Sequence, residues 1–301
     1  MDADIDGPEA TGRSTVPDPV DAILAAYRVP GPWQRMKATG VSNRIYATHD
    51  VVLRVATDHD DAIVDALTES IAAPVARQAG ILTPRLIAFD NSRKLVDRPF
   101  SMWERVRGET LGLLNLSTEM HEQIWREVGQ QIARLHDRVK SCPDPNGYLD
   151  RPERETRLDL LLRRFADSGY GKGDFLREIE RLILDLSPFV SSQGGSDCFL
   201  HNDMHESNIM CSSQGKLLAV IDWGDAGWGD PTLDFAAIPF AFISVALHGH
   251  GTTEQLGKNP EALIVWDHLQ NALDDAIEDP AYGVPVAEYR RFLDRTHRTS
   301  R

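Results

Sequence analysis

The sequence has 301 residues, of which 42% are hydrophobic, and its formal net charge is −14. A chain of this length and apolar content can build a sizeable core, as one two-lobed unit or as two modest domains. The acidic balance argues against a nucleic-acid partner and permits a cationic substrate. No apolar run approaches the ~20 residues of a membrane-spanning helix, so we expect no membrane partner.

The N-terminus and the cysteines bear on the compartment. The first six residues are acidic and lack the apolar segment of a secretory signal. The three cysteines, Cys142, Cys198 and Cys211, have neither an even count nor a metal-like spacing. We therefore expect a protein of the reducing cytoplasm.

The first third of the chain predicts a small mixed unit. Residues 1–19 are polar and contain several Pro and Gly, which predicts a disordered lead-in. Residues 21–27 are a short helix candidate. Two or three antiparallel strands are expected within 36–47 and 51–56, and two more within 81–89 and 98–108.

A longer helix is predicted between these strands, from about residue 60 to Gln78. Its apolar stripe consists of Val64, Leu67, Ile71 and Val75. Pro74 lies inside this pattern and should kink or split the helix, because it removes a backbone donor.

The rest of the chain is mostly helical. Ser117 is a plausible N-cap for a helix with a 3-4-spaced apolar stripe that continues to Val139. Further helices are predicted over 156–166, 174–186 and 236–247. A last one, over 261–279, has an apolar face and an opposite face with Asp267, Asp274 and Glu278.

The most informative stretch lies late in the chain. Two apolar runs, 209–211 and 217–221, flank a turn and predict a β-hairpin. One end of this hairpin presents Asp203 and Asn208, spaced D-x-x-x-x-N, together with Asp222. Phosphoryl transfer from ATP needs such a set: one carboxylate orients the attacking hydroxyl, while a second carboxylate and an amide oxygen hold Mg²⁺ against the phosphates.

This stretch resembles the aminoglycoside phosphotransferase family, small-molecule kinases related to choline kinase and to protein kinases. The family's loop usually reads H-G-D-x-x-x-x-N and is followed by I-D-W or I-D-F. Here His201-Asn202-Asp203…Asn208 and Ile221-Asp222-Trp223 stand in that order, and Gly229–Ala236 is similar to the family's G-D-P-x-x-D block. Asn202 replaces the usual Gly, and Asn tolerates unusual backbone angles better than most residues.

The resemblance implies an α+β, two-lobed, protein-kinase-like fold. We expect a nucleotide-binding N-lobe with an antiparallel sheet over residues 20–105. A mostly helical C-lobe, residues 106–301, would hold the catalytic loop, the metal site and the substrate site. ATP with Mg²⁺ would lie between the lobes.

The resemblance also assigns roles to residues. Asp203 would activate the acceptor hydroxyl, and Asn208 and Asp222 would ligate Mg²⁺. Arg54 stands where a kinase has its β3 lysine, and it would clamp the phosphates with Glu69 of the next helix as its partner. The alternative is that Arg54 and Glu69 are solvated surface charges.

Further nucleotide contacts are implied by position. The turn at 40–43 would cover the phosphates, and the strand exit near residue 102 would be the hinge, with Met102 behind the adenine. The expected nucleotide-binding residues are Ser42, Asn43, Arg54, Glu69, Met102, Trp103 and Arg105. His201 would brace the catalytic loop, and His136 would be a core histidine.

The resemblance favours a cationic acceptor, because C-lobe carboxylates of aminoglycoside kinases receive ammonium groups. The substrate-binding candidates are Asp225, Asp230, Asp267, Asp274 and Glu278. An aminoglycoside or similar antibiotic is the first hypothesis, with antibiotic resistance as the role. The alternatives are a metabolic kinase for an amino alcohol, sugar or nucleoside, a non-catalytic protein of this fold, and a zinc hydrolase with His201 and His205 as ligands. A solvated acidic face also explains the last helix.

Overall fold

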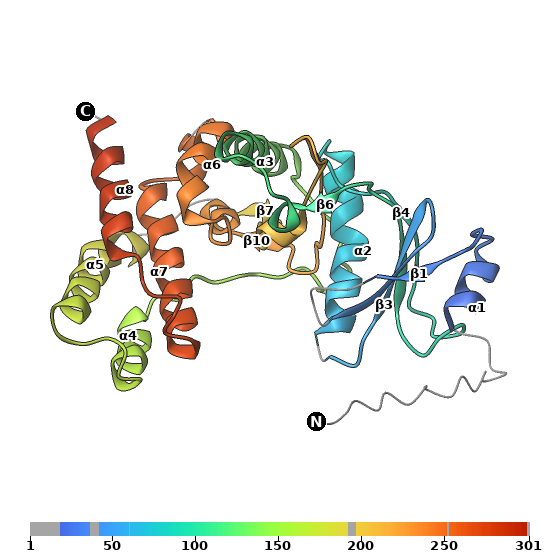
Figure 1. Cartoon of the computed structure of the whole chain (residues 1–301), viewed down its shortest axis with the longest axis horizontal. Coiled ribbons are helices and arrows are strands. Elements are labelled where there is room, and N and C mark those ends of the chain that lie inside the picture. Colours follow the sequence, from blue (N-terminus) through green and yellow to red (C-terminus); the bar gives the residue numbers. More distant parts are fainter. Residues whose placement is uncertain (1–18, 37–41, 60, 192–196, 252, 300–301) are drawn as a thin grey trace, which may run out of the picture.

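The computed structural model describes residues 19–36, 42–59, 61–191, 197–251 and 253–299. It consists of two lobes: a sheet with two helices lies at one end, and a larger, mostly helical part lies at the other (Figure 1). The predicted α+β, two-lobed fold is confirmed. The lead-in predicted for residues 1–19 lies, except for Pro19, outside the described residues.

The N-lobe is built on a five-stranded antiparallel sheet with the order β1-β2-β3-β5-β4. Its strands are β1 (Gln34–Arg35), β2 (Asn43–Ala47), β3 (Val51–Ala56), β4 (Leu86–Asp90) and β5 (Phe100–Glu104). In the centre of the sheet, β3 pairs with β5 so that Arg54 lies opposite Ser101 and Val52 opposite Trp103. Strands β2 to β5 agree with those predicted from the apolar runs, whereas β1 lies before the first predicted range, which begins at residue 36.

The two faces of this sheet are covered by different helices. Leu53 and Met102 are buried in a small core with Ile23 of α1 (Pro19–Ala26). Side chains alternate along a strand, so Trp103 lies on the opposite face, in the main core. The position predicted for Met102, behind the adenine, is therefore wrong, because its side chain points to α1, on the face of the sheet opposite to Arg54.

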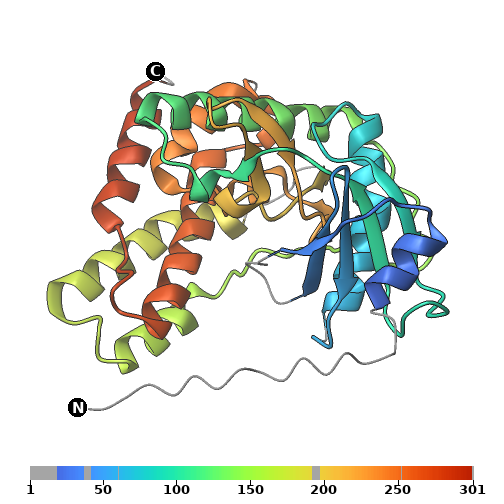
Figure 2. The same cartoon turned by 45° about the vertical axis from the view of Figure 1, so that its right-hand side comes forward.

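Helix α2 (Ala62–Gln78) lies between the sheet and the C-lobe in Figure 1, and the turned view shows it packed directly beside the strands (Figure 2). Alanines dominate its buried face, which brings its backbone close to its neighbours. Pro74 lies inside the helix, and the helix continues through it. Of the two predicted effects, the split is therefore wrong, and the kink stays a prediction. Glu69 points inward from this helix and is 5% exposed.

The C-lobe is organised around α3 (Thr118–Arg138), which begins as predicted at Ser117. The Ser117 hydroxyl accepts a hydrogen bond from the Met120 N–H at 3.3 Å, which satisfies one of the free donors of the first turn. Helix α6 (Ile243–His250) packs tightly against α3: a Cβ added to Gly129 would lie 2.0 Å from the Ala246 carbonyl oxygen.

The remaining helices of the C-lobe gather at the end of the molecule away from the sheet (Figure 1). They are α4 (Leu158–Asp167), α5 (Gly173–Ser191), α7 (Pro260–Glu278) and α8 (Val286–Thr299). The helix predicted over 236–247 is wrong in its bounds, because Pro239 interrupts it and α6 begins only at Ile243. Helix α8 was not predicted. Within the described residues, no helix combines the length and apolar character that crossing a bilayer requires.

Short strands and 3₁₀ turns lie in the connections between these helices. One small sheet consists of β6 (Glu109–Thr110), β8 (Ile209–Cys211) and β9 (Leu217–Val220), so the predicted hairpin is present. A second pairs β7 (Cys198–Leu200) with β10 (Gly227–Gly229). The short 3₁₀ turns are η1 (Leu111–Leu113), η2 (Glu206–Asn208), η3 (Pro231–Phe235), η4 (Phe240–Phe242) and η5 (Thr253–Leu256).

The close contact of α3 and α6 gives a stability prediction. Gly129→Ala should lower the free energy of unfolding by about 1–3 kcal/mol, because the added methyl group overpacks the helix contact. Denaturant unfolding measures this. Gly112→Ala is the control, since a Cβ there meets its nearest neighbour at an ordinary 3.4 Å. Equal stability of both variants would contradict the packing argument.

Candidate active site

The loop between β7 and β8 brings Asp203 and Asn208 together. The Asn208 side-chain amide donates to the Asp203 carboxylate (2.8 Å) and to the Asp203 carbonyl (2.9 Å). Asn208 is buried, while the Asp203 side chain is 34% exposed. The five-residue spacing therefore places a fixed but accessible carboxylate at the surface of the C-lobe.

Asp222 follows the neighbouring strand β9 and completes the predicted trio. Its backbone has φ +65°, which turns the chain directly after the strand. Burial opposes the charge of Asp222, but the Arg54 guanidinium outweighs it, so the pKa of Asp222 lies below its usual range. The carboxylate is thus held ionised.

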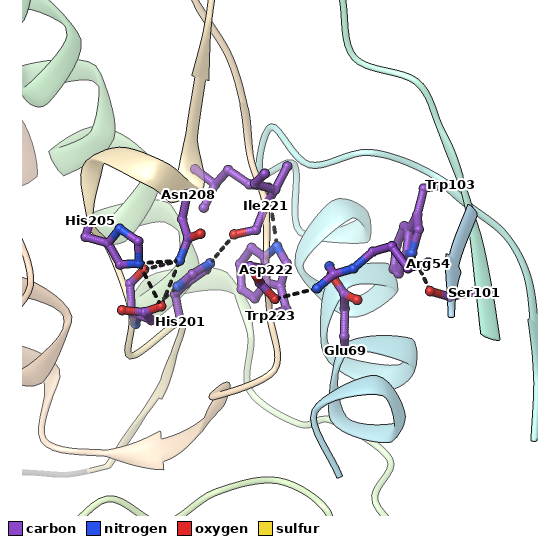
Figure 3. Close-up of polar contacts among 12 residues, drawn as sticks. Arg54, Glu69, Ser101, Trp103, His201, His205, Asn208, Ile221, Asp222 and Trp223 are labelled. Carbon is purple, nitrogen blue, oxygen red and sulfur yellow. Dashed lines mark hydrogen bonds and ion pairs between the residues drawn. The ribbon is translucent and has the colours of Figure 1, made fainter. Parts of the chain in front are cut away.

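Arg54 joins the two lobes at this point. Its Nη2 donates to Asp222 (2.9 Å), and its Nη1 donates to Glu69 of α2 (2.5 Å). The Arg54 and Glu69 side chains are 13% and 7% exposed, so the reading as solvated surface charges is wrong. Figure 3 shows the row Glu69, Arg54 and Asp222 leading toward Asn208.

His201 connects the loop between β7 and β8 to Ile221, the residue before Asp222. Its Nδ1 accepts from the Asp203 N–H (3.2 Å), and its Nε2 donates to the Ile221 carbonyl (3.0 Å). Burial lowers the pKa of His201, so the ring is neutral and this tautomer is fixed. Both ring nitrogens are used, so His201 cannot ligate zinc without losing these bonds. In the described part of the chain, no three His, Cys, Asp or Glu side chains come together as a metal site.

Asp234 of η3 holds the backbone of the same loop through hydrogen bonds. Its Oδ1 accepts from the backbone N–H groups of His201 (2.9 Å) and Asn202 (2.7 Å). Its Oδ2 contacts His136 Nε2 at 2.8 Å, and both side chains are fully buried. His136 therefore lies in the core, as predicted, and supports the loop through Asp234. The sequence contained a signal for Asp234, the last aspartate of the G-D-P-x-x-D block, but no role was predicted.

His205 is a second residue whose role was missed. Its Nε2 lies 3.2 Å from the Asp203 carboxylate, and its Nδ1 accepts from the Ser207 N–H at 3.1 Å. The hydrogen bond to Asp203 raises the pKa of His205. A partly exposed imidazole is thus in direct contact with the candidate catalytic carboxylate.

The oxygen atoms of Asn208 and Asp222 fit a magnesium ion. The Asn208 amide nitrogen is used by Asp203, so its oxygen remains as an acceptor, and Figure 3 shows it on the side toward Asp222. An amide oxygen and one ionised carboxylate are hard ligands of the kind that Mg²⁺ takes together with phosphate oxygens.

The predicted nucleotide contacts are only partly as expected. Ser42 hydrogen-bonds Asp65 of α2 through its side chain, and Asn43 begins β2. Residues 40 and 41 of the predicted phosphate turn lie outside the described residues. Trp103 is buried and donates its indole N–H to Ser101 (2.8 Å).

The backbone donors at the strand exit are already used. The N–H of Glu104 bonds the Arg85 carbonyl, and that of Arg105 bonds the Asp50 carbonyl, both at 2.9 Å. The Arg105 side chain donates to the Thr48 carbonyl at 2.6 Å. Arg105 therefore closes the β2–β3 turn, and its N–H is not free for an adenine.

The predicted substrate residues lie in two parts of the chain. Asp225 and Asp230 lie in the segment between Asp222 and η3, and Asp267, Asp274 and Glu278 lie on α7. Asp225 is only partly exposed and lies near Asp203, and its pKa is raised to about 6 by partial burial and by the carboxylates of Asp203 and Asp65. Asp230 instead caps η3, accepting from the Thr232 N–H (2.9 Å) and hydroxyl (2.5 Å). Asp274 lies half-buried, 3.9 Å from Arg164, and Glu278 is exposed.

The predicted acidic surface stripe on α7 is wrong at Asp267. This side chain is 6% exposed and forms a bidentate pair with Arg154, at 2.6 and 2.8 Å. All residues from 262 to 269 are buried, because η3, α4, α5 and α8 all contact α7. The sequence pattern assigned only one face of this helix to the core, and it gave no signal for Arg154.

Comparison with known proteins decides the family. The profile of the phosphotransferase enzyme family, APH, matches residues 37–259. The chain belongs to this family. The family transfers phosphoryl groups, so the chain is a phosphotransferase, and the acceptor group is a hydroxyl. No curated protein matches the sequence.

Solved structures share the fold of this phosphotransferase at low sequence identity. A choline/ethanolamine kinase family protein from Mesorhizobium loti has a TM-score of 0.55 and 15% identity, covering 92% of this chain and 94% of that one. The GDP and kanamycin complex of APH(2″)-IIIa has a TM-score of 0.59 and 14% identity, covering 93% and 98%. Spectinomycin phosphotransferase with ADP and spectinomycin has a TM-score of 0.57 and 11% identity, covering 91% and 93%.

The backbone at Asn202 gives a prediction for the loop of this phosphotransferase. Its φ is +68°, where a β-branched side chain costs of order 1–3 kcal/mol. Asn202→Val should lower the thermal midpoint and the turnover, whereas Asn202→Gly should keep both near wild type. Thermal unfolding and a rate assay measure this. A Val variant as stable as the Gly variant would contradict the strain argument.

Proposed function

We propose that this phosphotransferase transfers the γ-phosphoryl group of ATP, bound with Mg²⁺, to a hydroxyl of a small molecule that carries an amine. The observation that supports this best is the row of charged groups Glu69, Arg54 and Asp222, which ends beside Asn208 and Asp203. Positioning and charge stabilisation are the main contributions of a protein to phosphoryl transfer.

Asp203 orients the acceptor. Asn208 and the His205 ring hold its carboxylate, which accepts the proton of the attacking hydroxyl as the new O–P bond forms. The bond between the γ-phosphorus and the bridging oxygen of the β-phosphate breaks, and ADP leaves with that oxygen. His201 and Asp234 fix the backbone on which this carboxylate stands. The His205 contact also places a neighbouring proton donor beside Asp203.

Asn208, Asp222 and Arg54 receive the phosphates. Bound Mg²⁺ would offset the negative charge of the phosphate oxygens, held by the oxygens of Asn208 and Asp222. Arg54 stands between the two lobes, and its planar guanidinium suits phosphate oxygens. Glu69 keeps one edge of that guanidinium fixed.

The adenine lies against the strand exit after β5. Since the N–H groups of Glu104 and Arg105 are used within the protein, the next backbone donor along the chain is that of Val106. We propose Val106 as the hinge donor in place of Arg105. Trp103 closes the inner wall on the side of Arg54.

The acceptor amine faces an excess of carboxylates. Partial burial and the nearby carboxylates of Asp203 and Asp65 raise the pKa of Asp225. An ammonium group near Asp225 would offset this charge. A solved phosphotransferase of the same fold forms a complex with GDP and kanamycin, which supports an antibiotic acceptor. A choline/ethanolamine kinase family protein of the same fold supports an amino alcohol as the second candidate.

Catalysis is tested at the aspartates. Asp203→Ala should lower kcat by at least ~10²-fold, the usual scale for losing a positioned acid or base, with little change in the affinity for MgATP. Asp222→Asn should weaken MgATP binding and turnover together. ADP release and calorimetry measure these, with exposed Asp137→Ala on α3 as the control. Near wild-type turnover of Asp203→Ala would reject the assignment.

The acceptor is tested by its charge. With kanamycin or ethanolamine as acceptor, KM should rise between low and moderate salt, because ions screen exposed charges over a Debye length of ~8 Å at physiological ionic strength. Asp225→Asn should raise this KM and leave the KM for ATP unchanged. Glu278→Gln, an exposed carboxylate on α7, is the matched control. A best acceptor without positive charge, such as a neutral sugar, would leave the sugar or nucleoside kinase as the better hypothesis.

A further inference from the structure

A buried arginine outside the catalytic trio links three segments of the C-lobe. The Arg154 side chain is 1% exposed. Its Nε and Nη2 donate to Asp267 of α7 at 2.6 and 2.8 Å, and Nη2 also donates to the Thr232 hydroxyl at 2.6 Å. Its Nη1 lies 3.5 Å from the Asp230 carboxylate. One guanidinium thus faces two carboxylates and a hydroxyl in the interior.

Arg154 lies in the segment that crosses between the two halves of the molecule. The segment runs without regular structure from the isolated bridge at Asp150 to the start of α4, and Figure 1 shows it passing from the side of α2 to α4. Nearby, the Trp266 indole N–H donates to the Glu155 carbonyl at 2.7 Å. The segment is thus attached to α7 by both a charged and a neutral contact.

The contacts of Arg154 reach the catalytic loop through η3. Thr232 and Asp230 form the beginning of this short helix and bond each other at 2.5 Å. Asp234, near its other end, accepts the N–H groups of His201 and Asn202. The strand before η3, β10, pairs with β7, which leads directly into the same loop.

The chemistry of Arg154 suits a rigid connection. A guanidinium presents its donors in a fixed planar fork, so a bidentate contact fixes direction as well as distance. A lysine could provide the charge but not this geometry. A buried charge also has to keep its partners, because removing one leaves the other unpaired in the interior.

We propose that Arg154 is a positioning residue, which holds η3 against α7 and thereby sets the orientation of the loop that carries Asp203. The proposal rests on the proposed function of Asp203. Arg154 acts through Thr232 and Asp234 and does not touch the reacting groups. Asp267 serves as the anchor of Arg154.

Four variants separate positioning from support of the fold. Arg154→Met removes the fork. Arg154→Met/Asp267→Leu replaces the buried pair with apolar groups of similar size, an exchange that often preserves stability. Thr232→Val removes only the hydroxyl that joins Arg154 to η3 and leaves the Arg154–Asp267 pair in place. Arg154→Lys keeps the charge without the fork.

Two measurements are made on the full chain. The first is hydrogen exchange of the His201 and Asn202 amides, with the Leu53 amide of β3 as the control. The second is the basal hydrolysis of MgATP, in which water takes the place of the acceptor. In the double variant and in Thr232→Val, the His201 and Asn202 amides should exchange at least about tenfold faster. Both variants should also hydrolyse MgATP at least about tenfold more slowly, because small displacements of a catalytic group are costly. The KM for MgATP should not change.

The outcomes are distinct. A double variant that regains wild-type stability, exchange and hydrolysis makes Arg154 a support of the fold only, and the proposal fails. If the double variant does not fold, Thr232→Val decides alone, and wild-type exchange there also rejects the proposal. A wild-type protein that neither binds nor hydrolyses MgATP refutes the proposed function, while the exchange measurement still tests the connection.

Discussion

The buried carboxylate of Asp234 is the interaction on which the site depends. A carboxylate without solvent is unfavourable unless hydrogen bonds compensate it, and here two backbone N–H groups and a histidine do so. The donors belong to the catalytic loop and to α3, so satisfying the charge and shaping the loop are the same event. This is why a loop with an exposed aspartate can have one conformation without regular secondary structure around it.

The same logic applies to the other charges of the interior. Arg54 and Arg154 each lie between two carboxylates from different segments. Each pair joins parts of the chain that apolar packing alone would leave free to slide, because a hydrophobic contact has no fixed direction. The protein therefore uses its apolar core for stability and its few buried ions to set the relative position of lobes and helices.

Much of the site could be predicted from the sequence because its geometry is local. The D-x-x-x-x-N spacing and the hairpin after it place Asp203, Asn208 and Asp222 within one loop and one turn. The pairing of Arg54, on a strand, with Glu69, on the next helix, was implied by the family resemblance, and the structure contains it. The errors arose where the answer depends on distant parts of the chain. The face of β5 on which Met102 lies is set by strand register, and the burial of Asp267 is set by helices that surround α7 on several sides.

The ion pair between Arg54 and Asp222 has a consequence for the energy of ligand binding. It connects a strand of one lobe to a turn of the other, so the two surfaces that would enclose a triphosphate are already held at a fixed separation. Ordering of flexible groups is a large part of the cost of binding, and a preorganised cleft avoids much of it. In exchange, Arg54 has to divide its donors between the protein and an incoming phosphate. Binding would then be governed less by closure of the lobes than by competition among anions for a single guanidinium.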